Sequence, residues 1–237
     1  MAKRLLVVGA HSADFVWRAG GAIAVTAAAG GAARVVALSY GERGESGELW
    51  KQPDQTVEQV KEIRRGEAER AAGHLGADFV ALDLGDYPLE IDRDALGRIA
   101  DAIREFAPDV LLTHTLVDPF NPDHGVAGAA VSRARSLAAG AGVPSAFATV
   151  SPPALYAFEP HQSELCDFTP TVFLDITPVW EQKLAAMAEM KAQQYLVPYY
   201  TAAAERRANH ARRGSGDTGV RYAEAFQRMI PQTVSEL

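Results

Sequence analysis

Short apolar runs alternate along the first part of the chain with longer segments in which apolar residues recur at helical spacing. The apolar runs predict buried strands at residues 4–10, 33–40, 78–84 and 109–114. The segments between and after them predict helices at residues 16–31, 57–76, 93–108 and 124–139. Strands that alternate with helices indicate a mostly parallel sheet with helices on both faces, which is an α/β fold of the Rossmann-like kind.

The second part of the chain has a less regular pattern. Two further strands are predicted at residues 154–160 and 171–177, and one helix at 178–195. From about residue 199 the chain is rich in Ala, Arg and Gly, and we expect an irregular C-terminal segment there. The sequence has no linker, repeat or low-complexity stretch, so we expect residues 1–237 to form a single domain.

Composition narrows the classes of partner. The formal net charge of −7 argues against nucleic acids and anionic membranes as partners. No apolar stretch approaches the ~20 residues that a membrane-spanning helix needs. Cys166 is the only cysteine, so an intrachain disulfide is excluded and a reducing compartment is the simpler interpretation. We therefore expect a cytoplasmic protein that acts on a small molecule, and we expect it to form a homo-oligomer.

Polar residues with metal-binding chemistry follow two of the predicted strands. "AHSAD" follows the first strand and "THTLVDPFNPDH" follows the fourth. In the common doubly wound strand order these strands are neighbours, and ligands bind beyond their carboxyl ends. His11, Asp14 and His124 would supply two imidazoles and a carboxylate, a donor set typical of catalytic zinc sites. Asp123, beside His124, could orient an imidazole by a hydrogen bond to the ring nitrogen that does not bind the metal. Alone, "HSAD" is as compatible with an ordinary loop in which Asp14 caps a helix.

Together, "AHSAD" and "NPDH" resemble the motifs of the PIG-L/LmbE family of zinc-dependent N-acetylglucosaminyl deacetylases. "RRGEAERAAGHLG" and "RYAEAF" resemble further segments of that family, so the resemblance extends over most of the chain. It implies a PIG-L/LmbE-like fold and one zinc ion per chain. The family's zinc ligands correspond to His11, Asp14 and His124, and all three are present.

Three positions depart from the deacetylase pattern. The Asp that serves as general base in the family's AHPDDE motif is Ala13 in this chain, and the Glu that ends the motif is Phe15. The first His of the family's HPDH motif, which assists the deacetylase transition state, is Asn121. An alanine cannot accept a proton from water, so the family's deacetylation mechanism is not expected.

The loop after the second strand carries another set of acidic residues. "SYGERGESGELW" contains Glu42, Glu45 and Glu48, with glycines that allow sharp turns. Such a loop is often no more than a solvated acidic surface. Together with "AHSADFVWRAGGAIA", however, it resembles one branch of the family, the 4-oxalomesaconate (4-carboxy-2-hydroxymuconate) hydratases. This resemblance implies a lyase that hydrates its substrate to 4-carboxy-4-hydroxy-2-oxoadipate in gallate and protocatechuate degradation, with Glu48 as the acid/base residue.

A substrate with several carboxylates requires cations in its pocket, preferably arginines, which bind carboxylates in a bidentate manner. The candidates are Arg43, Arg64 and the arginines of the 206–221 segment, among them Arg212. For each of them, a solvated surface position is the ordinary alternative. Asn121 and His161 are further candidates for the substrate pocket.

Two other functions remain open at the level of sequence. The chain could be an N-acetyl sugar deacetylase of the parent family that uses a different base, although Ala13 and Asn121 argue against it. It could also be a small-molecule binder that has kept the metal without catalysis, although the glutamate loop argues against that.

Overall fold

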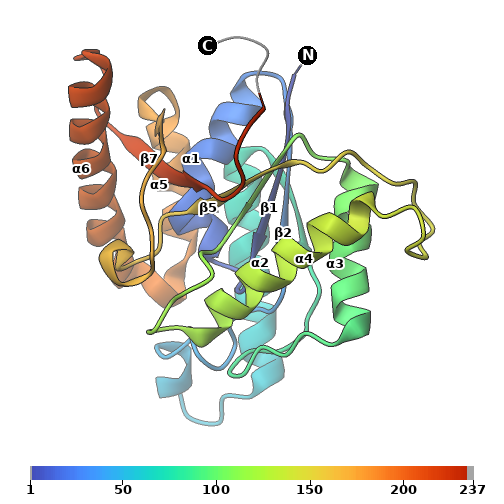
Figure 1. Ribbon diagram of the computed structural model, residues 1–237. Coiled ribbons are helices and arrows are strands. Elements are labelled where there is room, and N and C mark those ends of the chain that lie inside the picture. The colour runs from blue at the N-terminus through green and yellow to red at the C-terminus, as the bar shows by residue number, and fades with distance from the viewer. Residues whose placement is uncertain (1, 234–237) are drawn as a thin grey trace.

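A computed structural model describes residues 2–233 of the chain as a sheet between two layers of helices (Figure 1). The strands are β1 (Arg4–Gly9), β2 (Ala32–Ala37), β3 (Ala77–Ala81), β4 (Val110–Thr113), β5 (Ala154–Phe158), β6 (Val172–Asp175) and β7 (Ala223–Arg228). The α-helices are α1 (Asp14–Ala28), α2 (Val57–Leu75), α3 (Arg93–Phe106), α4 (Pro122–Ala139), α5 (Trp180–Glu189) and α6 (Val197–Ser215). The strand order is β3-β2-β1-β4-β5-β7-β6.

Strands β1 to β5 run parallel, whereas β7 pairs antiparallel with both β5 and β6. Because side chains alternate across a strand, β1 contributes to both layers of the core. Leu5 and Val7 pack with residues of α1, α2 and α5, and Leu6 and Val8 pack with residues of α3 and α4. The predicted α/β fold with helices on both faces is confirmed.

The strand order places β1 between β2 and β4. Leu5 of β1 pairs with Ala33 of β2 and with Val110 of β4, so the carboxyl ends of all three strands point to one edge of the sheet. The loops that follow these strands therefore meet, and helices α1 and α4 begin at the same edge. This confirms the predicted neighbourhood of "AHSAD" and "NPDH".

The C-terminal segment differs from the expectation of irregular chain from about residue 199. Residues Val197–Ser215 form helix α6, which lies against β6 and β7 (Figure 1). Tyr200, Ala204, Arg207 and Ala208 are its buried residues, and their spacing is that of one helical face. The reason for the correction is that two of these positions are alanine and one is arginine, so the buried face lacks the large apolar residues that mark most amphipathic helices.

The predicted helix at 178–195 is shorter than expected, since α5 ends at Glu189 and a 3₁₀ segment, Lys191–Leu196, follows it. Within residues 2–233, none of the helices combines the length and the apolar character that crossing a membrane would require.

Candidate metal centre

His11 and Asp14 occupy the turn between β1 and α1. Both residues are almost fully buried, and the backbone N–H of His11 donates a hydrogen bond to Oδ2 of Asp14 at 2.8 Å. Asp14 is the first residue of α1, where the helix dipole favours a negative charge. Asp14 does not act as a side-chain cap of α1. The turn thus holds a carboxylate beside an imidazole.

Glu45 comes from the loop that follows β2. Gly41 has a φ of 70°, a left-handed conformation that glycine adopts without a steric penalty. Asp86 accepts hydrogen bonds from the backbone N–H groups of Arg43 and Gly44, which fixes the loop against the segment after β3. This folding brings Oε1 of Glu45 to 3.3 Å from Nδ1 of His11 and 3.5 Å from Nε2 of His124.

His124 lies in the first turn of α4. Its Nδ1 contacts Oδ2 of Asp118 at 2.7 Å, so Nε2 faces the cluster, 3.5 Å from Oδ1 of Asp14. Asp123 accepts hydrogen bonds from the backbone N–H groups of Tyr87 and Leu89, and its Oδ2 lies 3.3 Å from Nε2 of His11. Asp123 was expected to orient an imidazole, and in the structure that imidazole is His11, whereas Asp118 holds His124.

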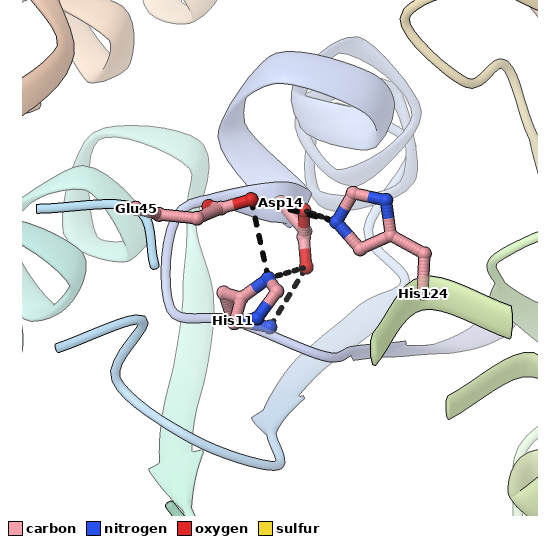
Figure 2. A group of neighbouring side chains, drawn as sticks. All are labelled: His11, Asp14, Glu45 and His124. Carbon is pink, nitrogen blue, oxygen red and sulfur yellow. Dashed lines mark hydrogen bonds and ion pairs between the residues drawn. The ribbon is translucent and has the colours of Figure 1, made fainter. Parts of the chain in front are cut away.

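Four side chains point toward one another (Figure 2), and their possible ligand atoms all lie within 4.8 Å of one another. They are those of His11, Asp14, Glu45 and His124. Nδ1 of His11 and Nε2 of His124 are buried, and neither makes a hydrogen bond of acceptable geometry. The opposite nitrogen of each ring faces a carboxylate, which is the usual arrangement behind metal-binding histidines. Burying a ring nitrogen without a hydrogen-bond partner costs free energy of folding. A divalent cation bound between these two nitrogens and the nearby carboxylates would give both nitrogens a partner.

The charges of this cluster reinforce one another. Burial lowers the pKa of the His11 imidazole, but the carboxylates of Glu45 and Asp123 outweigh burial and raise that pKa well above its ordinary value. Burial also opposes ionisation of Glu45, but the facing imidazoles hold its pKa well below the ordinary value. These opposing shifts show a site that concentrates negative charge around two imidazoles.

His114 supports the cluster from the end of β4. Its ring stacks on that of His124 with 4.1 Å between the ring centroids, and its Nε2 accepts a hydrogen bond from the backbone N–H of Ala10. Burial lowers the pKa of His114 to about 3, so its imidazole is neutral at physiological pH. A neutral ring in this position orients His124 without adding positive charge.

A cavity of about 230 Å³ opens onto the cluster. Asp14, Glu45 and His124 form part of its wall, together with Asn121 and His161. The two residues that the sequence suggested for a substrate pocket, Asn121 and His161, therefore do line it.

The arginines that the sequence suggested do not line this cavity, which corrects the expectation. The three that were singled out by number have partners elsewhere. Arg43 pairs with Glu42 and Asp86, Arg64 pairs with Glu67, and Arg212 donates to the backbone oxygen of Val220. The cavity instead contains Arg18, which sequence analysis missed. The available signal was its position four residues after Asp14, on the same face of α1.

Glu48 also lies away from the cluster. Its side chain is half exposed and pairs with Lys51 at 2.6 Å, in the 3₁₀ turn that ends the loop. Glu45 is the glutamate that this loop brings to the cluster of His11, Asp14 and His124. The loop turns at Gly41, and Asp86 holds the backbone of Arg43 and Gly44, so that Glu45 faces the cluster whereas Glu48 is exposed to solvent.

Comparison with known proteins agrees with this geometry. The profile of the GlcNAc-PI de-N-acetylase (PIG-L) family matches residues 6–135, which include His11, Asp14 and His124. The 4-oxalmesaconate hydratase of Pseudomonas putida KT2440 is 48% identical over 238 residues, covering 99% of this chain and 92% of the relative.

Two solved structures extend the comparison. GalB, the 4-carboxy-2-hydroxymuconate hydratase from Pseudomonas putida KT2440, superposes with a TM-score of 0.96 at 47% identity, covering 99% of both chains. The N,N'-diacetylchitobiose deacetylase from Pyrococcus horikoshii has a TM-score of 0.80 at 22% identity, covering 96% of this chain and 84% of its own, and shares the fold. With a family match over more than half of the chain and a relative that aligns along nearly all of it, this chain belongs to the PIG-L family.

Proposed function

We propose that this protein is a metal-dependent hydro-lyase that adds water to 4-oxalmesaconate, also named 4-carboxy-2-hydroxymuconate. The product would be 4-carboxy-4-hydroxy-2-oxoadipate, an intermediate in the degradation of gallate and protocatechuate. The likeness to the hydratase of Pseudomonas putida KT2440 along nearly the whole chain, in sequence and in structure, supports this substrate class. The proposal includes a cytoplasmic location and a homo-oligomeric state, the latter testable by light scattering of the purified protein.

The single observation that carries the proposal is that a carboxylate from the β2 loop faces the histidines, whereas the position of the deacetylase base holds an alanine. Ala13, beside Asp14, has no group that can accept a proton, and it is buried in an apolar cluster that includes Phe15. The carboxylate of Glu45, from a different loop, faces the same two histidines.

The metal that we propose is one zinc ion per chain, held by His11, Asp14 and His124. Two imidazoles and one carboxylate, with room for further ligands, are the donors that catalytic zinc prefers. When bound, the cation would polarise a substrate oxygen and stabilise the negative charge that develops on the substrate during hydration.

Glu45 is the residue that we propose for proton transfer. Nδ2 of Asn121 donates a hydrogen bond to its Oε1 at 3.0 Å, which orients the carboxylate and favours its ionised form. As the water oxygen bonds to one carbon of the double bond, Glu45 accepts the proton that water loses. The other carbon of the double bond takes up a proton from solvent, and Glu45 releases to solvent the proton that it accepted, so the elements of one water molecule are added.

The test is a spectrophotometric assay of the conjugated substrate. Hydration of the double bond shortens the conjugation, so the near-ultraviolet absorbance of 4-carboxy-2-hydroxymuconate should fall with the zinc-loaded protein. The rate should drop when a chelator removes the metal and recover when zinc is restored. Release of acetate from an N-acetyl sugar, without any loss of this absorbance, would instead identify a deacetylase. No turnover of either substrate by zinc-loaded protein would support a binder without catalysis.

A further inference from the structure

Arg18 presents a buried positive charge to the cavity beside the metal cluster. It lies on α1, and only 6% of its side chain is exposed. Among the residues described, none accepts a hydrogen bond from its Nε or Nη1, and both atoms are buried. The neighbouring Asp14 approaches Nε no closer than 3.6 Å, too far for a hydrogen bond.

Aromatic side chains also lie close to Arg18. The guanidinium carbon lies 5.9 Å from the ring centre of Phe158, and the side chains of Trp17 and Tyr200 line the same cavity. An arginine is charged at every physiological pH, so its burial without hydrogen-bond partners is unfavourable. A ligand of opposite charge in the cavity would supply the missing partner.

Arg18 is also the single lysine or arginine among the described residues that line the cavity. Asp14, Glu45 and Asp118 contribute carboxylates to the same wall, and the chain carries a net negative charge. An anionic substrate would therefore meet repulsion on most sides of this cavity. Apart from a metal ion, Arg18 is the group that can offset this repulsion.

We propose that Arg18 binds a carboxylate of a polycarboxylate substrate and so sets the orientation of that substrate at the metal cluster. This inference rests on the proposed function for the identity of the substrate. The physical reason is that a guanidinium supplies several N–H donors in one plane, and its hydrogen bonds to carboxylates are charge-assisted. One turn of helix separates Arg18 from Asp14, so the bound carboxylate would lie next to the metal and not on it.

The test compares Arg18→Gln, Arg18→Lys and the control Arg133→Gln, which changes an exposed arginine of α4. The first readout is binding of propane-1,2,3-tricarboxylate, a tricarboxylate without a double bond, to zinc-loaded protein by calorimetry. We expect Arg18→Gln to weaken this binding by roughly ten- to a hundredfold, in line with loss of a charge-assisted hydrogen bond. Arg18→Lys should bind with intermediate affinity, and Arg133→Gln like the wild type.

The second readout is hydration of the substrate. Arg18→Gln should lower kcat/KM by a similar factor, mainly through KM. Zinc content and thermal melting are measured for each variant, since a folded, zinc-loaded Arg18→Gln protein is needed for a valid comparison. If Arg18→Gln disturbs either property, Arg18→Lys, which keeps the charge near Asp14, carries the test by its binding of the tricarboxylate.

Unchanged affinity for the tricarboxylate in both Arg18 variants would overturn the inference, even if the wild type hydrates 4-carboxy-2-hydroxymuconate. Conversely, tricarboxylate binding that depends on Arg18 in a protein without hydratase activity would support the inference and contradict the proposed function. The two proposals are thus tested separately.

Discussion

Oε1 of Glu45 lies 3.3 Å from Nδ1 of His11, although the two residues belong to loops that follow different strands. Of the three glutamates of the β2 loop, Glu45 is the one that faces His11 and His124, and it is therefore the one that we propose for proton transfer. Glu42 is fully buried, and its Oε2 accepts a hydrogen bond from the backbone N–H of Tyr40, whereas Glu48 is half exposed and pairs with Lys51.

We expect Glu45→Gln to reduce kcat by ~10²-fold or more, because glutamine keeps the size of the side chain but cannot accept a proton. Zinc content should be unchanged, since His11, Asp14 and His124 remain. The matched variant Glu48→Gln should retain kcat within about twofold, as expected for an exposed ion pair. Steady-state kinetics and metal analysis of both variants distinguish Glu45 from Glu48 as the residue that transfers the proton. A large loss of kcat in Glu48→Gln alone would assign proton transfer to Glu48.

Replacement of a proposed metal ligand should abolish the effect of zinc on stability. A ligand that binds only the folded state stabilises it by about 4 kcal/mol at a concentration of about 1,000 times its Kd. Zinc should therefore raise the melting temperature of the wild type, and a chelator should reverse the rise. The His124→Ala variant should melt at the same temperature with or without zinc. A full zinc complement in His124→Ala by elemental analysis would contradict the assignment.

The carboxylates behind the histidines should contribute to metal affinity. Asp118 contacts Nδ1 of His124 at 2.7 Å, and loss of such a partner typically weakens metal binding ~10- to 100-fold. Asp118→Asn should show this decrease in competition with a chromophoric chelator. Asp78→Asn, a change at an exposed position of β3, serves as the control. Equal zinc affinities for the two variants would mean that Asp118 does not support His124.

Close packing of α4 on the β4 loop should matter for both stability and metal binding. A Cβ atom at Gly128 would lie 2.7 Å from the backbone oxygen of Thr115 and 2.8 Å from that of His114. Gly128→Ala should destabilise the protein by about 1–3 kcal/mol, a typical cost of overpacking. It should also lower zinc affinity, because α4 carries His124.

The control for this packing is Gly97→Ala on α3, where an added Cβ meets no atom within 4 Å. There the substitution should leave stability unchanged or raise it by up to about 1 kcal/mol, since alanine favours helix more than glycine does. Chemical denaturation of both variants measures the difference. Equal stabilities would show that α4 can move away from the loop without cost.

The sequence by itself determined the parallel part of the sheet and the three proposed metal ligands, but not β7, which lies in the segment that was expected to be irregular. His11, Asp14 and His124 stand directly after predicted parallel strands or at the start of a predicted helix. Since the carboxyl ends of neighbouring parallel strands share one edge, local patterns and a common strand order were sufficient to bring these residues together. The position of α6 was also present in the pattern, but alanines and an arginine on its buried face weakened the signal.

Only the tertiary structure decided which glutamate and which arginine face the cavity. A loop has no periodicity from which the direction of a side chain could be derived, and Glu45 points inward because Asp86, from another loop, fixes the backbone of residues 43 and 44. The arginines differ in whether a partner distant in sequence already neutralises them. Arg43 forms an ion pair with Asp86, whereas Arg18 lines the cavity. Contacts between residues so far apart in the sequence form only when the chain folds.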